Sequence, residues 1–167
     1  GSSNTAVGVL ALYANTTGAE NTAVGFEALR NNSSGTPNNA FGRQALRSNS
    51  TGNGNCAFGE QALQANTTAS NNTAAGHNAL TANTTGTGNT ALGMRALVAN
   101  TTGGLNISIG KDSLYAQTTG SSNVAVGVSA LQNNTTASNN TAVGQQALFA
   151  NTTGHDNVAM GINAMAG

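Results

Sequence analysis

The chain has 167 residues, of which five are basic and five acidic, so its formal net charge is zero, and it contains one Pro and no Trp. This balance, with no cluster of Lys or Arg, excludes nucleic-acid binding, because proteins of that class hold phosphate groups with concentrated positive charge. The low hydrophobicity would suit a disordered chain, but disordered segments also carry high net charge or lack a fixed repeat.

A seventeen-residue repeat runs through the sequence without insertion or deletion. Its clearest copy is residues 140–156, NTAVGQQALFANTTGHD. A fixed period of this length is typical of a solenoid, in which each copy forms one coil. We therefore interpret residues 1–167 as a single array, and we expect it to be part of a longer one because its first three residues match the end of a coil. The ten copies begin at Asn4, Asn21, Asn38, Asn55, Asn72, Asn89, Asn106, Asn123, Asn140 and Asn157.

Positions 1 to 5 of each copy predict a short strand between two turn residues. Position 1 is Asn and position 5 is Gly in every copy, position 2 is mostly β-branched, and position 4 is always apolar. Because the side chains of a strand alternate between its two faces, we expect position 4 to point into the coil. The Ala at position 3 is then expected to face outwards, where another surface could pack closely against it.

Positions 6 to 12 predict the return half of the coil. Two variable residues are followed by Ala and Leu at positions 8 and 9, which predicts a tight helical or irregular turn with Leu as a second large core side chain. Position 12 is Asn in every full copy except one, which has Gln117. Stacked amides can hydrogen-bond from coil to coil, so we expect asparagine ladders at position 12 and at the ten Asn residues that begin the copies.

The charged residues lie only at positions 6, 7, 10 and 17 of the copies. Charged side chains are rarely buried unless they are paired, so these positions are expected to form solvated edges. With about two large side chains buried per coil, worth roughly 1.5 to 3 kcal/mol each, a single coil hardly offsets an ordering cost of about 1.5 kcal/mol per residue. We therefore expect copies of the chain to associate side by side through the row of alanines.

The motif Asn-Thr-Ala-Val-Gly-x-x-Ala resembles the head repeat of trimeric autotransporter adhesins. The whole seventeen-residue form is similar to repeats of other bacterial surface proteins and of phage tail-fibre proteins. Ala142, Val143, Gly144 and Ala147, with their counterparts in the other copies, carry this resemblance. The resemblance implies a left-handed parallel β-roll that forms a parallel homotrimer outside the cell, on a cell surface or a virion. It also implies adhesion to a host surface or a glycan. The present repeat departs from the adhesin repeat by an inserted Leu-x-x-Asn-Thr-Thr.

No catalytic or metal-binding group is predicted. His77 and His155 lie about five coils apart, the chain has only two Asp, and no Cys/His cluster has the spacing of metal ligands. We therefore predict a protein that is not an enzyme and carries no cofactor, and read the chain as a structural or adhesive fibre segment. No apolar run approaches the roughly 18 residues that span a membrane, so no membrane span is expected.

Two alternative functions remain open from the sequence, an ice-binding solenoid and an inert spacer. The ice-binding alternative is based on two Thr-rich rows at positions 13 and 14, which could form a regular surface lattice. Because neighbouring residues of an extended chain point to opposite faces, only one of the two rows is expected to face outwards. The Thr residues at position 13 are Thr16, Thr67, Thr84, Thr101, Thr118, Thr135 and Thr152, and those at position 14 are Thr17, Thr51, Thr68, Thr85, Thr102, Thr119, Thr136 and Thr153.

Overall fold

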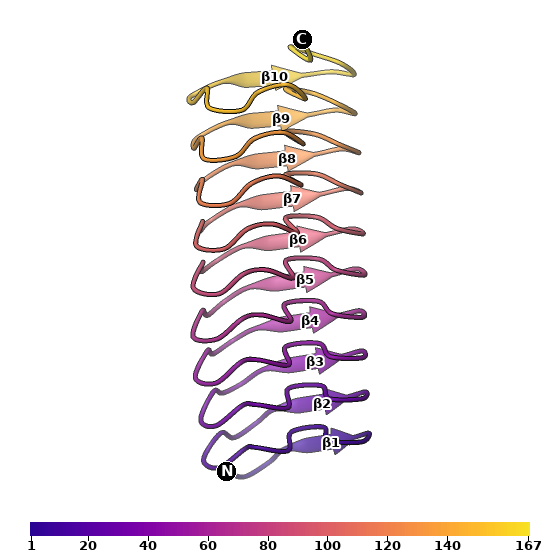
Figure 1. Ribbon diagram of the computed structural model, residues 1–167, viewed down its shortest axis with the longest axis vertical. Helices are drawn as coiled ribbons and strands as arrows, with labels where there is room; N and C mark the ends of the chain where they lie inside the picture. Colours follow the sequence, from indigo (N-terminus) through magenta and orange to yellow (C-terminus); the bar gives the residue numbers. More distant parts are fainter.

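The computed structural model describes residues 1–167 as one parallel β-solenoid (Figure 1). Each copy of the repeat forms one coil with one three-residue strand, and the ten strands form a single parallel sheet in chain order. The predicted all-β solenoid with one coil per copy is confirmed. No part of the chain forms a helix that could cross a membrane. The strands are β1 (Thr5–Val7), β2 (Thr22–Val24), β3 (Asn39–Phe41), β4 (Cys56–Phe58), β5 (Thr73–Ala75), β6 (Thr90–Leu92), β7 (Ile107–Ile109), β8 (Val124–Val126), β9 (Thr141–Val143) and β10 (Val158–Met160).

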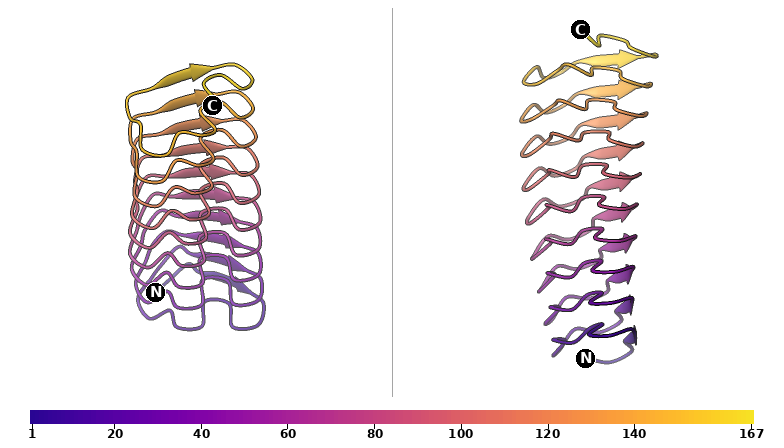
Figure 2. Two further views of the ribbon diagram at one scale, coloured as in Figure 1. Left: turned by 45° about the horizontal axis from the view of Figure 1, so that its top comes forward. Right: turned by 45° about the vertical axis from the view of Figure 1, so that its right-hand side comes forward.

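The strands pair in identical register along the whole stack. Thr5 lies opposite Thr22, Ala23 opposite Ala40, and each later pair joins residues seventeen apart. Equivalent side chains therefore form straight columns along the rod. At about 4.8 Å per strand, the ten coils make a rod on the order of 45 Å long, and its constant cross-section is visible in Figure 2.

The irregular part of each coil also stacks through backbone hydrogen bonds. Of 106 backbone hydrogen bonds, only 18 lie within the strands. Leu29 N donates to Ala45 O at 2.9 Å and Asn31 N to Arg47 O at 3.0 Å, so the return half of one coil bonds to the return half of the next. Since nearly every buried backbone group must find a partner, this pairing is what allows so few strand residues to hold the solenoid together.

The core is thinner than the sequence predicts, and the predicted orientation of the strands is wrong. The Ala at position 3 points into the coil and is fully buried in β2 to β6, whereas the apolar residue at position 4 faces outwards and is half-buried or exposed. Figure 2 shows that each coil is flattened, with the strand along one side and the return segment along the other. Leu at position 9 enters from the return segment, so the facing strand residue has room only for a methyl group.

The turn between the two sides is irregular and not helical. In every coil the residues at positions 7 and 9 adopt left-handed backbone conformations, with φ of 55° to 59° at position 7 and 48° to 55° at position 9. Such a conformation costs about 1 to 2 kcal/mol for a residue other than Gly. The cost is offset because this turn directs the side chain at position 9 into the core, where each Leu of this column from Leu29 to Leu148 is buried; Leu12 in the first coil is half-buried and Met165 in the last coil is exposed.

The Gly at position 5 is required by both conformation and space. Gly76 has a φ of 139°, and a Cβ atom placed on it would lie 2.5 Å from the carbonyl oxygen of Gly93 in the next coil. The same contact recurs along the column, so any side chain here would push two coils apart. This explains why position 5 is Gly in all ten copies.

We expect Gly76→Ala to destabilise the rod by at least about 2 kcal/mol, because it combines an unfavourable φ with a backbone clash. The neighbouring substitution His77→Ala is the matched control, since His77 is exposed and makes no hydrogen bond through its side chain. Urea-induced unfolding followed by circular dichroism measures both. Equal stability of the two variants would contradict the close contact between the glycine backbones.

Candidate functional site

Two asparagines, at positions 1 and 12, close most coils, and in the interior of the rod both are buried. In the second coil, Asn21 Nδ2 and Asn32 Nδ2 both donate to the carbonyl oxygen of Gly35, at 2.9 and 3.0 Å. Asn21 occupies position 1, Asn32 position 12 and Gly35 position 15, so the two amides meet at one carbonyl. All three residues are buried, and equivalent contacts recur in the other coils. This cross-brace is structural and leaves no amide free for a ligand.

The ladders that the sequence predicts connect these braces along the rod. At position 1, the backbone N–H of each Asn donates to the side-chain oxygen of the Asn before it, as Asn38 N does to Asn21 Oδ1 at 2.9 Å. At position 12, each Nδ2 donates to the preceding Oδ1, as Asn49 does to Asn32 at 2.9 Å. The Asn residues of the two end coils, Asn4 and Asn157, are half-buried, and the others at position 1 are fully buried.

Gln117 interrupts the ladder at position 12. Its Nε2 donates to Gly120 O at 2.7 Å, and its Oε1 accepts from Asn134 Nδ2 at 2.8 Å. The longer side chain does not reach back to the previous coil, and Asn100 Oδ1 is left buried without a hydrogen-bond partner. One rung of the ladder is therefore missing.

We expect Gln117→Asn to restore that rung and to raise the free energy of unfolding by about 1 kcal/mol, because it supplies a donor to a buried acceptor. Gln132→Asn is the matched control at position 10, where the side chain forms no hydrogen bond inside the protein. Urea denaturation of both variants and of the wild type measures the difference. A loss of stability in Gln117→Asn would mean that the missing rung is not the defect in this coil.

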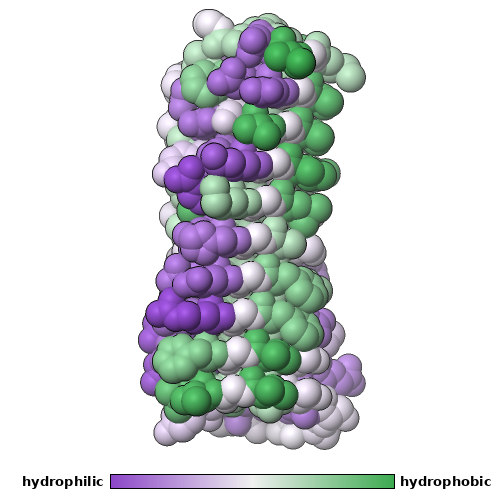
Figure 3. All heavy atoms as spheres, turned by 90° about the vertical axis from the view of Figure 1, so that its right-hand side faces the viewer, coloured by the Kyte–Doolittle hydropathy of each residue, from purple (hydrophilic) through white to green (hydrophobic).

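The outward side of the sheet forms an uncharged strand face, which we define as positions 2 and 4 of the ten coils. No charged residue lies in either column. In Figure 3 the apolar column of position 4 runs along the whole rod beside the pale column of glycines. The predicted use of the alanine row as the contact surface is wrong, because those alanines lie inside the coil, and the strand face is the surface that remains open.

The strand face is most apolar around β7. Ile107 is 40% exposed and Ile109 37% exposed, and Leu105, which precedes this strand, is 67% exposed. In the neighbouring strands, Leu92 and Val124 continue the aliphatic surface. Toward the N-terminal end, the rings of Phe41 and Phe58 stack with centroids 4.9 Å apart, at the spacing of the coils.

The two Thr rows differ in exposure. At position 13, hydroxyls donate to the carbonyl of the same position in the next coil, as Thr84 Oγ1 does to Thr101 O at 3.1 Å. At position 14, all nine residues are exposed, and none of their hydroxyls donates a hydrogen bond to the protein. Only the row at position 14 is therefore free to contact a surface or solvent lattice.

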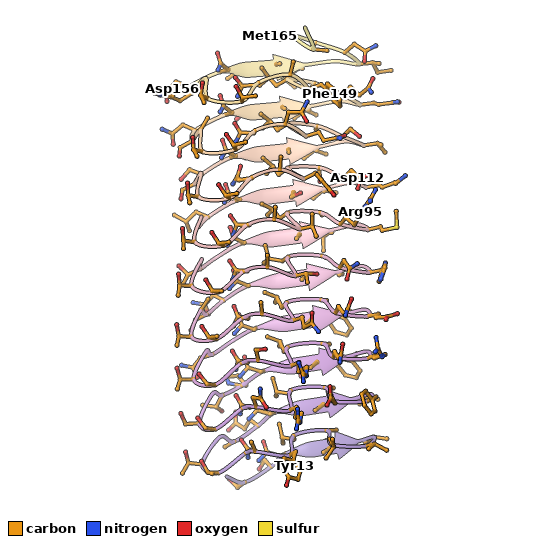
Figure 4. The ribbon with its side chains drawn as sticks, in the orientation of Figure 1. Tyr13, Arg95, Asp112, Phe149, Asp156 and Met165 are labelled. Atoms are coloured by element: carbon orange, nitrogen blue, oxygen red, sulfur yellow. The ribbon has the colours of Figure 1, made fainter.

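Two carboxylates lie deeper than the sequence predicts. Glu27 is only 8% exposed and Asp112 only 9%, so the prediction that position 7 is a solvated edge is wrong for both. Each is paired with arginine. Arg95 donates from Nε and Nη2 to the two oxygens of Asp112 at 2.8 and 2.9 Å, and these two side chains point toward each other in Figure 4.

The environment of Glu27 favours its ionised form. The hydrogen bond from Gln44 lowers the pKa of the carboxyl group, partial burial opposes this shift, and the positive charges of Arg47 and Arg30 add to the lowering. Because the folded pKa lies below the unfolded one, the stabilisation by this carboxylate is present at neutral pH. It is lost as the pH falls through the lowered value.

Neither an acid–base pair nor a metal centre is assembled. No three His, Cys, Asp or Glu side chains lie close enough to hold a metal ion. His155 Nδ1 is 3.9 Å from Asp156 Oδ2, but both side chains are largely exposed, and His77 lies on a different coil. An open hollow at the last coil, lined by Leu148, Asn151 and Met165, is the uncovered stacking surface of the rod.

No protein-family model matches this chain, and no curated protein and no solved structure matches it either.

Proposed function

We propose that this chain is a non-enzymatic segment of an extracellular fibre, which extends and displays the parts of the protein joined to it on a cell surface or virion. The stacked, in-register coils support this proposal, because they give a rod whose length grows in equal steps while its cross-section stays constant. The single observation that carries it is the uncharged strand face along the whole rod. A long surface without charge suits a permanent contact with the same surface of a second copy of the chain.

We further propose that copies associate in parallel through the strand face, as a homotrimer. Contiguous apolar patches of several hundred Å² on soluble proteins usually mark interaction sites. The whole strand face, which joins the apolar column of position 4 to the Thr-rich column of position 2, is about 45 Å long and about 10 Å wide and offers on the order of 450 Å² per copy. This area is small beside the roughly 800 Å² per partner of a typical interface, and the proposed number of three copies rests on the resemblance of the repeat to the head repeat of trimeric autotransporter adhesins.

The substitution Ile109→Lys is expected to dissociate this assembly, because it places a charge at the centre of the strand face. Sedimentation equilibrium measures the mass, which should fall from about three times 16.4 kDa to 16.4 kDa. Val128→Lys is the matched control: Val128 is also aliphatic and is 46% exposed, but it lies at position 6, outside the strand face. A wild-type chain that remains a monomer at high micromolar concentration would refute the association, as would equal dissociation of the two variants.

Ice binding is a second candidate function, favoured by the free row of hydroxyls at position 14. This row repeats once per coil and carries Thr in eight of its nine coils and Ser34 in the ninth. It is a single row, because the hydroxyls of position 13 are used within the protein. Thermal hysteresis of the wild-type chain tests this candidate, with Thr102→Lys expected to abolish it. Absence of hysteresis at high micromolar concentration would eliminate ice binding.

A further inference from the structure

Two arginines lie one coil apart in the column of position 10 and donate no hydrogen bond. The chain has four arginines. Arg43 donates to Glu60 at 2.9 Å and Arg95 donates twice to Asp112. Arg30 and Arg47 approach only Glu27, and the Nε atoms of both are buried without a hydrogen-bond partner. Arginine normally matches its planar donors to an oxyanion. The buried Nε atoms are out of reach of a ligand, but the Nη atoms of both residues also donate no hydrogen bond within the protein, so these outer donors are available to an anion.

The charge of this cluster is also unbalanced. Arg47 Nε lies 2.9 Å from Glu27 Oε2, and Arg30 Nη1 lies 3.4 Å from Glu27 Oε1, so both arginines form ion pairs with the same carboxylate. Glu27 thus compensates one of two adjacent positive charges, and the cluster keeps a net charge of +1. The side chains of the two arginines remain 31% and 34% exposed. A second anion can therefore reach them from solution.

The residues around the arginines suit a sugar polymer. Tyr13, in the same column one coil before Arg30, is 70% exposed, and Figure 4 shows it on the lowest coil. Asn31, next to Arg30, is exposed, and its side-chain amide makes no hydrogen bond within the protein. An exposed aromatic ring can pack against the apolar face of a sugar, while a free amide can bond to its hydroxyl groups.

We propose that Arg30 and Arg47 bind the carboxylate or sulfate group of an acidic polysaccharide that lies along the rod. Equivalent atoms of the two residues are separated by about one coil spacing, roughly 4.8 Å, so the oxygens of one such group can contact both guanidinium groups. A net charge of +1 suits a singly charged group and not the dense charge of a nucleic acid. An open column without a pocket suits a polymer and not a small molecule.

This site adds a ligand to the proposed fibre and does not depend on the association of its copies. Position 10 belongs to the return segment, whereas the strand face comprises positions 2 and 4. The two proposals therefore fail separately: the mass of the assembly tests the strand face, and ligand titration tests the arginines.

The wild-type chain is titrated with three oligosaccharides of similar length at low salt. The binding affinity of each is measured by isothermal titration calorimetry. The probes are an oligogalacturonate for the carboxylate, a sulfated dextran oligomer for the sulfate, and uncharged dextran as the neutral arm. The variants are Arg30→Gln, Arg47→Gln, Glu27→Gln and the control Arg43→Gln. Each introduces a residue that other coils carry at the same position, such as Gln64 at position 10, Gln44 at position 7 and Gln145 at position 6. All four variants should therefore fold, which circular dichroism verifies.

We expect at least one acidic oligosaccharide to bind, with an affinity that falls as salt is added. Arg30→Gln and Arg47→Gln should each weaken binding about tenfold, whereas Arg43→Gln should leave it unchanged. Glu27→Gln should tighten binding, because it raises the charge of the cluster from +1 to +2. If the arginines were purely structural, loss of an arginine and loss of Glu27 would not change the binding affinity in opposite directions.

Three results would overturn the proposal. The first is the absence of binding of either acidic oligosaccharide at millimolar concentration. The second is equal binding of the neutral dextran, which would remove the role of the oxyanion. The third is an equal loss in Arg43→Gln and Arg47→Gln, which would show that only the total charge of the chain matters.

Discussion

The solenoid depends on the buried hydrogen bonds by which two asparagines hold the carbonyl at position 15. These bonds tie the beginning of each coil, its return segment and its final turn to a single point, as Asn21 and Asn32 do at Gly35. A buried amide or carbonyl that loses its partner is costly. Asn is therefore fixed at position 1 and nearly fixed at position 12, and the rest of the coil can vary around this frame.

The second constraint is the small distance between the two sides of the coil. It admits one Leu and two Ala per coil and leaves no space beside Gly at position 5. The coil of residues 106–122 shows how a departure is accommodated. Ser108 and Ser113 replace the two core alanines together, are fully buried, and hydrogen-bond to each other. Each buried hydroxyl group thus gains the other as a hydrogen-bond partner, which it would lack if only one of the two alanines were replaced.

Because the inward positions are fixed by stacking, differences between coils accumulate in the outward columns. The strand face stays uncharged along the whole rod, which is consistent with one continuous role. Position 10, in contrast, changes from Tyr13 to Arg30 and Arg47 and then to Gln64 within four coils. A uniform surface suits contact between identical copies, whereas a local cluster suits a ligand of different chemistry.

The sequence by itself determined the period, the parallel stacking, the asparagine ladders and the burial of Leu at position 9, since each follows from like residues recurring seventeen apart. It could not determine which strand residues face the core. The alternation of side chains along a strand places the Ala at position 3 and the apolar residue at position 4 on opposite faces, but it does not say which face is inside. That choice depends on the space that remains beside the Leu at position 9, which enters the core from the return segment. Burial of Glu27 and the unused donors of Arg30 and Arg47 likewise arise only where side chains from different coils meet, because such contacts depend on distances across the coils that a single copy of the repeat does not contain.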